Sequence, residues 1–288
     1  MPLDTSVVGT MVGEMSFRAE PRWLMSYAAG VPDERSELYD TSRELVVHPL
    51  FTVAPEWELL TVPRTARGVM SADEARRGIH LAHDLMLERT VEAGEQIHLC
   101  AQVVGVGRRP AGATQDVLFS ATGIDGEVVW RTRFTSLFPG VDLIGEPVSI
   151  KADWTAPPLD PAPTTTPLAA RRSFIRQIDA HVYSECARIW NPIHTDIAAA
   201  RRSGLAAPIL HGTATLARAV SIVAELANVQ LGDVRRVAGR FAAMVDLGTE
   251  IEVRLLAVNG GHCSFEVCNH LGRRAIADGS VVVSSAMA

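Results

Sequence analysis

Residues 183–215 read YSECARIWNPIHTDIAAARRSGLAAPILHGTAT, and this stretch decides the fold prediction. A polar loop around Asn191-Pro192 and His194 leads into a segment that starts at Thr213. From Thr213 to Asn228, apolar residues recur three or four positions apart, which predicts an amphipathic helix. Asn228 is a suitable residue to end that helix. The sequence therefore predicts a reactive-looking loop placed just before a long, buried helix.

The residues after this helix are typical of antiparallel strands. Gly248-Thr249-Glu250-Ile251 opens a run rich in residues that favour strands, and Asn259-Gly260 and Leu271-Gly272-Arg273 are predicted turns. The first half repeats this pattern, since Gly94-Glu95-Gln96-Ile97 opens a similar run and Asp125-Gly126 marks a hairpin turn. An internal duplication explains both.

A proline-rich stretch, DWTAPPLDPAPTTTP at 153–167, separates the two halves and predicts a linker between domains 1–152 and 168–288. By analogy with the second half, the first should contain its own helical part. We expect it in Pro21 to Gly30 and in the segment around Val46 to Leu60.

The amino-acid composition argues against several classes of function. The 288 residues carry a net charge of −6, and their Arg-Arg pairs are scattered, so a nucleic-acid partner is not expected. The most apolar long segment, Pro208 to Ala227, contains His211, Arg218 and Glu225 and is a poor membrane span. The N-terminus lacks the pattern of a secretion signal, so we expect a cytoplasmic protein without a membrane partner. The cysteines have no zinc-type spacing: Cys100, Cys186, Cys263 and Cys268.

The stretch 183–215 resembles the signature of the MaoC-like, or R-specific enoyl-CoA hydratase (hydratase 2), family. The matching residues are Trp190-Asn191-Pro192-Ile193-His194, Asp196, Gly204 and Pro208-Ile209-Leu210-His211-Gly212. So many matches in one order are more specific than a single motif. The resemblance implies an α+β double hot-dog, in which two fused domains each wrap an antiparallel sheet around a central helix.

The resemblance also implies a hydratase or dehydratase of enoyl or 3-hydroxyacyl thioesters. In the family an Asp and a His activate water, and a glycine at the helix start offers its backbone N–H to the thioester carbonyl. His194 and Gly212 take the last two roles here, Asn191 holds the loop, and His211 is a packing or capping group. The first half would form the acyl pocket. No metal or redox cofactor is implied. The substrate would be carried as a coenzyme A or phosphopantetheine thioester, with an acyl carrier protein and a homodimer as candidate partners.

The sequence departs from the family at its catalytic Asp, because the residue two positions before Asn191 is Ile189. Three interpretations stay open. Another carboxylate replaces the Asp, with Glu185 the first candidate catalytic residue and Asp196 the second. Alternatively, His194 works nearly alone in an elimination or double-bond shift. In the third, the site only binds acyl groups or belongs to a degenerate partner subunit.

Four residues around the loop are predicted to bind substrate: Arg188, Ile189, Trp190 and His211. Arg188 could meet the phosphates of a carrier group, to which a guanidinium is well matched, or pair with Glu185. The apolar Ile189 would favour a bulky acyl group. Two further functions are a dehydratase or isomerase of an unusual biosynthetic intermediate and a non-catalytic binding module. A hot-dog thioesterase is disfavoured, since Thr213 to Leu216 offers no carboxylate.

Overall fold

The computed structural model describes residues 2–61, 78–150 and 166–284. The longer strands of the first half are β2 (Met11–Arg18), β3 (Ile79–Leu87), β4 (Gln96–Arg109), β5 (Gly112–Thr122) and β6 (Val128–Pro139). Those of the second are β9 (Ala169–Phe174), β10 (Val234–Phe241), β11 (Glu250–Asn259), β12 (His262–Cys268) and β13 (Arg274–Val283). The short strands are β1 (Leu3–Asp4), β7 (Leu143–Ile144) and β8 (Val148–Ser149).

The α-helices are α1 (Pro21–Gly30), α2 (Val53–Thr61), α4 (Asp179–Ala187), α5 (Ile197–Arg202) and α6 (Gly212–Leu226). The 3-10 turns are η1 (Thr5–Val7), η2 (Ser36–Leu38), η3 (Pro49–Thr52), η5 (Pro192–His194) and η6 (Leu231–Asp233). Both helical segments expected in the first half are present, as α1 and as η3 followed by α2.

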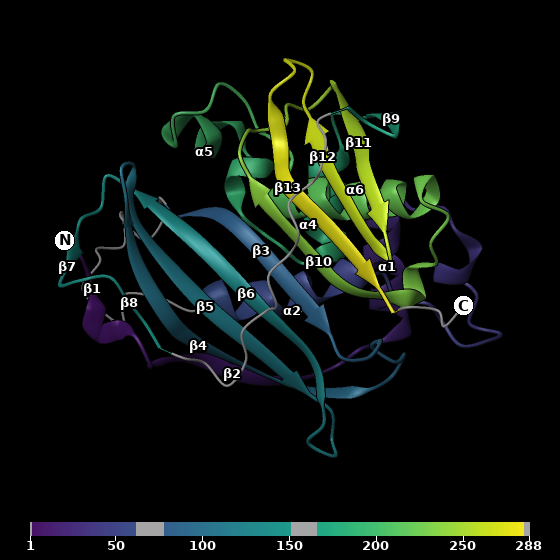
Figure 1. Ribbon diagram of the computed structural model, residues 1–288, viewed down its shortest axis with the longest axis horizontal. Helices are drawn as coiled ribbons and strands as arrows, with labels where there is room; N and C mark the ends of the chain where they lie inside the picture. Colours follow the sequence, from purple (N-terminus) through teal and green to yellow (C-terminus); the bar gives the residue numbers. More distant parts are fainter. Residues whose placement is uncertain (1, 62–77, 151–165, 285–288) are drawn as a thin grey trace.

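The long strands form one continuous antiparallel sheet in the order β2-β4-β5-β6-β3-β10-β13-β12-β11-β9. The two halves meet where β3 pairs with β10, for example at Leu85 opposite Val237. In Figure 1 the sheet curves around the helices of each half. The predicted α+β double hot-dog is confirmed.

The halves repeat each other element by element about the β3–β10 pair. Their strand orders are equivalent, β2-β4-β5-β6-β3 and β9-β11-β12-β13-β10, while α1 corresponds to α4 and η3–α2 to α6. Gly94 and Gly248, which precede the equivalent strands β4 and β11, have φ of +85° and +76°. Glycine adopts this left-handed region without steric cost, so it suits both strand entries. These matches support the predicted duplication.

The helix predicted over Thr213 to Asn228 is α6, and its central residues are almost all buried. Asn228 follows it with φ +54°, the left-handed conformation common after a helix end. Arg218 of α6 donates to Asp179 of α4 over 3.0 Å, and both side chains are buried. This ion pair fixes α6 against α4, which carries the residues before the polar loop.

Helices α1 and α4 pack closely across the two halves. A side chain at Gly30 would meet the Cβ atom of Cys186 at 2.7 Å, so the close approach requires glycine there. The predicted linker at 153–167 lies outside the described residues apart from its last two positions. Among the described residues, no helix is long and apolar enough to cross a membrane.

Candidate active site

His194 ends the 3-10 turn η5 and lies buried beside the start of α6. Asn191 caps this turn, because its side chain accepts a hydrogen bond of 3.4 Å from the backbone N–H of Ile193. The Nδ1 atom of His194 lies 2.9 Å from the carbonyl oxygen of Ile209. A carbonyl can only accept, so Nδ1 carries the proton and Nε2 keeps its lone pair. Burial lowers the pKa of His194 from 6.5 to about 4, so the imidazole is neutral at physiological pH.

His211, the residue before α6, stacks on His194 with the ring centroids 3.7 Å apart. Its Nε2 lies 3.1 Å from the Ser184 hydroxyl and 3.4 Å from the Ile189 carbonyl. Nδ1 is buried and has no partner among the described residues. Burial, and then the neighbouring His194, hold the pKa of His211 well below its usual value. The expected packing role is observed, whereas its side chain makes no capping hydrogen bond.

Gly212 is the first residue of α6, whose first N–H groups have no partner within the helix. A Cβ atom at this position would lie 2.9 Å from the Phe241 ring. Glycine is therefore needed for packing as well as for any approach of a substrate carbonyl. The helix start and the free Nε2 of His194 together offer a hydrogen-bond donor and a base.

Phe241 links this helix start to two histidines of the first half that sequence reasoning missed. His80 of β3 lies between Phe241 and Phe134, with centroid distances of 4.4 and 3.6 Å. His83 lies 5.4 Å from His80, and both of its ring nitrogens are buried without partners in the described residues. A bulge in the β3–β6 pairing between His80 and Ala82 lets both rings face the same side.

Tyr183 and Thr213 connect α4 to the first turn of α6. The Tyr183 hydroxyl donates to the Thr213 hydroxyl over 3.1 Å and lies 3.3 Å from that of Tyr27 in α1. Burial raises the pKa of Tyr183 to about 12, so the phenol keeps its proton. Because Tyr27 and Tyr183 occupy equivalent helices, the duplication in the sequence could have identified this pair.

Neither candidate carboxylate is hydrogen-bonded to His194 among the described residues. Glu185 is on the exposed side of α4, and no hydrogen bond or ion pair in the described parts of the chain joins it to His194. Asp196 caps α5 by accepting from the N–H groups of Ala198 and Ala199, at 2.7 and 3.2 Å. Ile189, at the position of the family Asp, is 3% exposed and packs in the core.

Arg188 lies over the ring of Trp23 in α1, with its guanidinium carbon 4.1 Å from the ring centroid. It has a left-handed backbone, φ +57°, at the end of α4. This contact joins the two halves. Trp190 is 61% exposed and points away from the core. Of the four residues predicted to bind substrate, His211 stacks on His194 and contacts the carbonyl of Ile189, while Arg188 and Trp190 are exposed.

A buried polar network between the two halves was also missed. Asp33 accepts from Ser221 of α6 over 2.6 Å and from Arg35 Nε over 2.9 Å, and His48 Nε2 lies 3.2 Å from the Ser221 hydroxyl. Burial alone would raise the pKa of Asp33, but these hydrogen bonds lower it. Since the Ser221 hydroxyl donates to Asp33, the network ties the halves together and leaves no activated nucleophile.

The part of the chain that holds this site matches a known domain family. Residues 159–273 match the model described as MaoC like domain. The resemblance predicted from residues 183–215 is confirmed for this half. The sequence matches none of the curated proteins with which it was compared.

Solved structures extend the likeness of fold to the whole chain. A MaoC-like dehydratase from Phytophthora capsici has a TM-score of 0.83 at 17% identity, and 98% of each chain is covered. Peroxisomal multifunctional enzyme type 2 from Drosophila melanogaster has a TM-score of 0.75 at 22% identity, with 94% of this chain and 48% of that one covered. A Mycobacterium tuberculosis protein with a double hot-dog fold has a TM-score of 0.61 at 12% identity, covering 96% of each chain. The fold is thus a double hot-dog over nearly its full length.

Proposed function

We propose that the protein is a hydro-lyase that adds water reversibly to the double bond of an enoyl thioester. The observation that carries the proposal is the neutral His194, whose Nδ1–H is held by the Ile209 carbonyl while Nε2 stays available. The match of residues 159–273 to a dehydratase-type domain family supports it.

The start of α6 supplies the second requirement. Adding water to an enoyl thioester builds negative charge on the carbonyl oxygen. The N–H of Gly212 at the positive end of the helix dipole can stabilise that charge. In a buried site such a donor lowers the barrier more than it would in water.

His194 can move both protons of the reaction. Its Nε2 accepts a proton from water as the water oxygen bonds to C3, and the electron pair of the double bond moves to the enolate. The imidazolium then returns the proton to C2, so water has been added and the site restored. Burial disfavours the imidazolium in the empty site, but the adjacent enolate compensates its charge. This scheme needs no second carboxylate, in agreement with the buried Ile189.

The substrate would be a 3-hydroxyacyl or enoyl thioester of coenzyme A or of a carrier protein. The direct test is to incubate the protein with crotonyl-CoA and longer enoyl-CoAs and to follow both loss of the conjugated double bond and release of free thiol. Hydration without thiol release supports the proposal. Thiol release would make the protein a thioesterase.

A second candidate is acyl-thioester binding without turnover. The observation that favours it is the absence, among the described residues, of any carboxylate hydrogen-bonded to His194. Saturable binding of enoyl-CoA with neither hydration nor thiol release would establish it.

The mechanism has two versions, one in which Glu185 acts together with His194 and one in which His194 acts alone. If Glu185 replaces the family Asp, Glu185→Gln lowers kcat more than it raises KM. Because this side chain is exposed on α4, we expect an unchanged kcat, as for a surface control such as Glu58→Gln on α2. A loss of kcat in Glu185→Gln but not in Glu58→Gln would show that Glu185 takes the role of the family Asp.

A further inference from the structure

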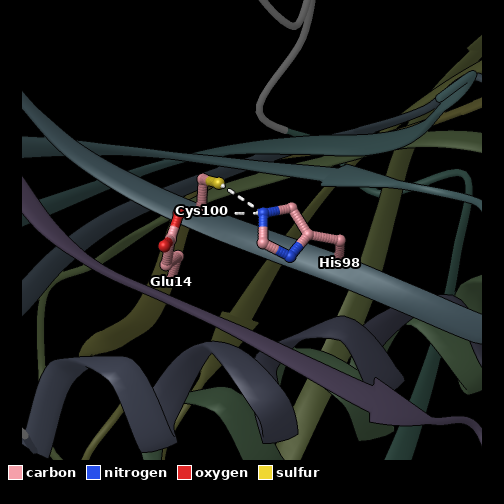
Figure 2. A group of neighbouring side chains, drawn as sticks. All are labelled: Glu14, His98 and Cys100. Carbon is pink, nitrogen blue, oxygen red and sulfur yellow. Dashed lines mark hydrogen bonds and ion pairs between the residues drawn. The ribbon is translucent and has the colours of Figure 1, made fainter.

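Three side chains with different metal-binding atoms converge on the outer face of the sheet, far from His194 in the fold. They are Glu14 of β2 and His98 and Cys100 of β4. Figure 2 shows the thiol and the carboxylate on the same edge of the imidazole ring. The Sγ atom of Cys100 lies 3.2 Å and the Oε2 atom of Glu14 3.9 Å from Nε2 of His98. The three donor atoms lie within 4.8 Å of one another.

The strand register produces this convergence. Glu14 is directly opposite Cys100, and Ser16 is directly opposite His98, in the antiparallel β2–β4 pair. Successive side chains of a strand alternate between the two faces, so His98 and Cys100 share the outer face while Leu99 between them is buried. No sequence spacing reveals the set, because one member comes from another strand.

Ser16 orients the imidazole. Its hydroxyl lies 3.2 Å from Nδ1 of His98, so it can accept the Nδ1–H and leave the Nε2 lone pair directed at the thiol and the carboxylate. Histidine ligands of metals are commonly held in this way through the other ring nitrogen. A nucleophile–base–orienter triad would place the carboxylate at Nδ1 instead. Here the thiol and the carboxylate face the same nitrogen, so one cation could contact all three side chains.

We propose that Glu14, His98 and Cys100 form a zinc site that joins the edge strand β2 to β4. A thiolate, an imidazole and a carboxylate are all ligands of Zn²⁺, and the two anions balance its charge. In a tetrahedral site with bonds of about 2.0–2.3 Å, ligand atoms lie about 3.3–3.6 Å apart. Small side-chain movements of Glu14, His98 and Cys100 would bring their donor atoms to these distances. Binding releases the thiol proton of Cys100 to solvent, and solvent completes the fourth position.

The consequence is stabilisation of the sheet edge. β2 is the terminal strand of the sheet, and it pairs with β4 alone among the described strands. A cation bound only by the folded state raises its stability by mass action.

The test uses the full-length protein without an affinity tag, freed of metal with a chelator and titrated with Co²⁺. We expect one equivalent to give a thiolate-to-cobalt absorption band and tetrahedral ligand-field bands, which Zn²⁺ then removes. Zn²⁺ should also raise the melting temperature. Cys100→Ser should lose the band and the thermal shift, and Ser16→Ala should weaken binding by about 10-fold. Gln96→Ala, an exposed residue of the same strand face, is the matched control and should keep both.

A missing cobalt–thiolate band in the wild type overturns the proposal. A band that persists in Cys100→Ser also overturns it, since it then belongs to another cysteine. If Cys100→Ser does not fold, Glu14→Gln replaces it, because Glu14 is 71% exposed and its loss does not disturb the core. Unchanged Co²⁺ affinity in Glu14→Gln would mean that Glu14 is not a ligand, and it would overturn the proposed three-residue site.

Discussion

The two halves share one framework but differ where each central helix begins. In the second half His211 precedes Gly212, whose N–H at the start of α6 has no hydrogen-bond partner among the described residues. In the first half His48 precedes Pro49, which has no N–H, and His48 Nδ1 accepts from the next N–H, that of Leu50. In the described residues, Pro49 and Leu50 therefore leave no free donor comparable to the N–H of Gly212, so the helix start of the second half fits the proposed chemistry better.

The carboxylate at the position of the family Asp is present in the first half and missing from the second. Ile189 lies six residues after Tyr183, and the residue six after Tyr27 is Asp33. Asp33 is buried and engaged by Arg35 and Ser221. One half thus has a carboxylate used for structure, and the other has the helix start and the imidazole without the carboxylate. Equivalent positions in the two halves therefore hold residues with different roles.

The largest expected effect tests whether the chemistry belongs to His194. His194→Gln should lower kcat/KM for an enoyl thioester by about 10²–10⁴-fold, the usual cost of losing a positioned acid–base group. Because burial lowers the pKa of His194 to about 4, the wild-type activity should persist as pH falls below 6.5 and decline only near that lower value. The measurement is a pH profile of the hydration rate, with melting curves for both proteins. Full activity in a folded His194→Gln protein would remove this residue from the mechanism.

A second substitution tests the difference between Gly212 and Pro49. Gly212→Ala should reduce the hydration rate by about 10²-fold, because a methyl group 2.9 Å from the Phe241 ring displaces the helix start. Pro49→Ala, at the same place in the first half, should leave the rate unchanged. The double variant Gly212→Ala/Phe241→Leu relieves the clash and should recover part of the loss. Equal losses from Gly212→Ala and Pro49→Ala would mean that both helix starts act through stability alone.

The third prediction concerns Asp33 and stability rather than turnover. Asp33→Asn should lower the free energy of unfolding by about 1–3 kcal/mol, because its buried partners lose a charged acceptor, while kcat stays unchanged. Hydrogen bonds lower the pKa of Asp33 below 3.8, so this stabilisation is present above that pH and is lost only as the pH falls below it. Denaturant unfolding at several pH values measures it. Asp40→Asn, which weakens an ion pair between the exposed Arg43 and the half-buried Asp40, is the control and should change little.

Features set by local sequence could be predicted. The helix after Thr213, the turns at Asp125-Gly126 and Asn259-Gly260, and the cap at Asn191 depend on neighbouring residues. The helix at Pro21–Gly30 has no such local signal and is expected only by analogy with the second half. Tertiary contacts could not be predicted in this way. Arg188 over Trp23 and Asp33 with Ser221 join segments more than a hundred residues apart. The bulge that brings His80 and His83 together depends on the partner strand.

The smallest expected effect, and the sharpest test of the comparison, comes from giving the second half the carboxylate that the first half has. Ile189→Asp places an acid at the position equivalent to Asp33. In the first half, the cation Arg35 lies two residues after Asp33, whereas the residue two positions after Ile189 is the uncharged Asn191. Without a cationic partner in a site 3% exposed, burial should raise the pKa of the new carboxyl and cost stability. If the loop keeps the geometry of the family, the acid still anchors a water near His194, and hydration of crotonyl-CoA should rise by a few-fold despite a lower melting temperature.

Ile189→Asn, whose side chain has the shape of Asp but no acid, is the matched control. A gain limited to the Asp variant would indicate that the site lost a single residue, whereas no gain in a folded protein would indicate that it has been rebuilt around His194 alone.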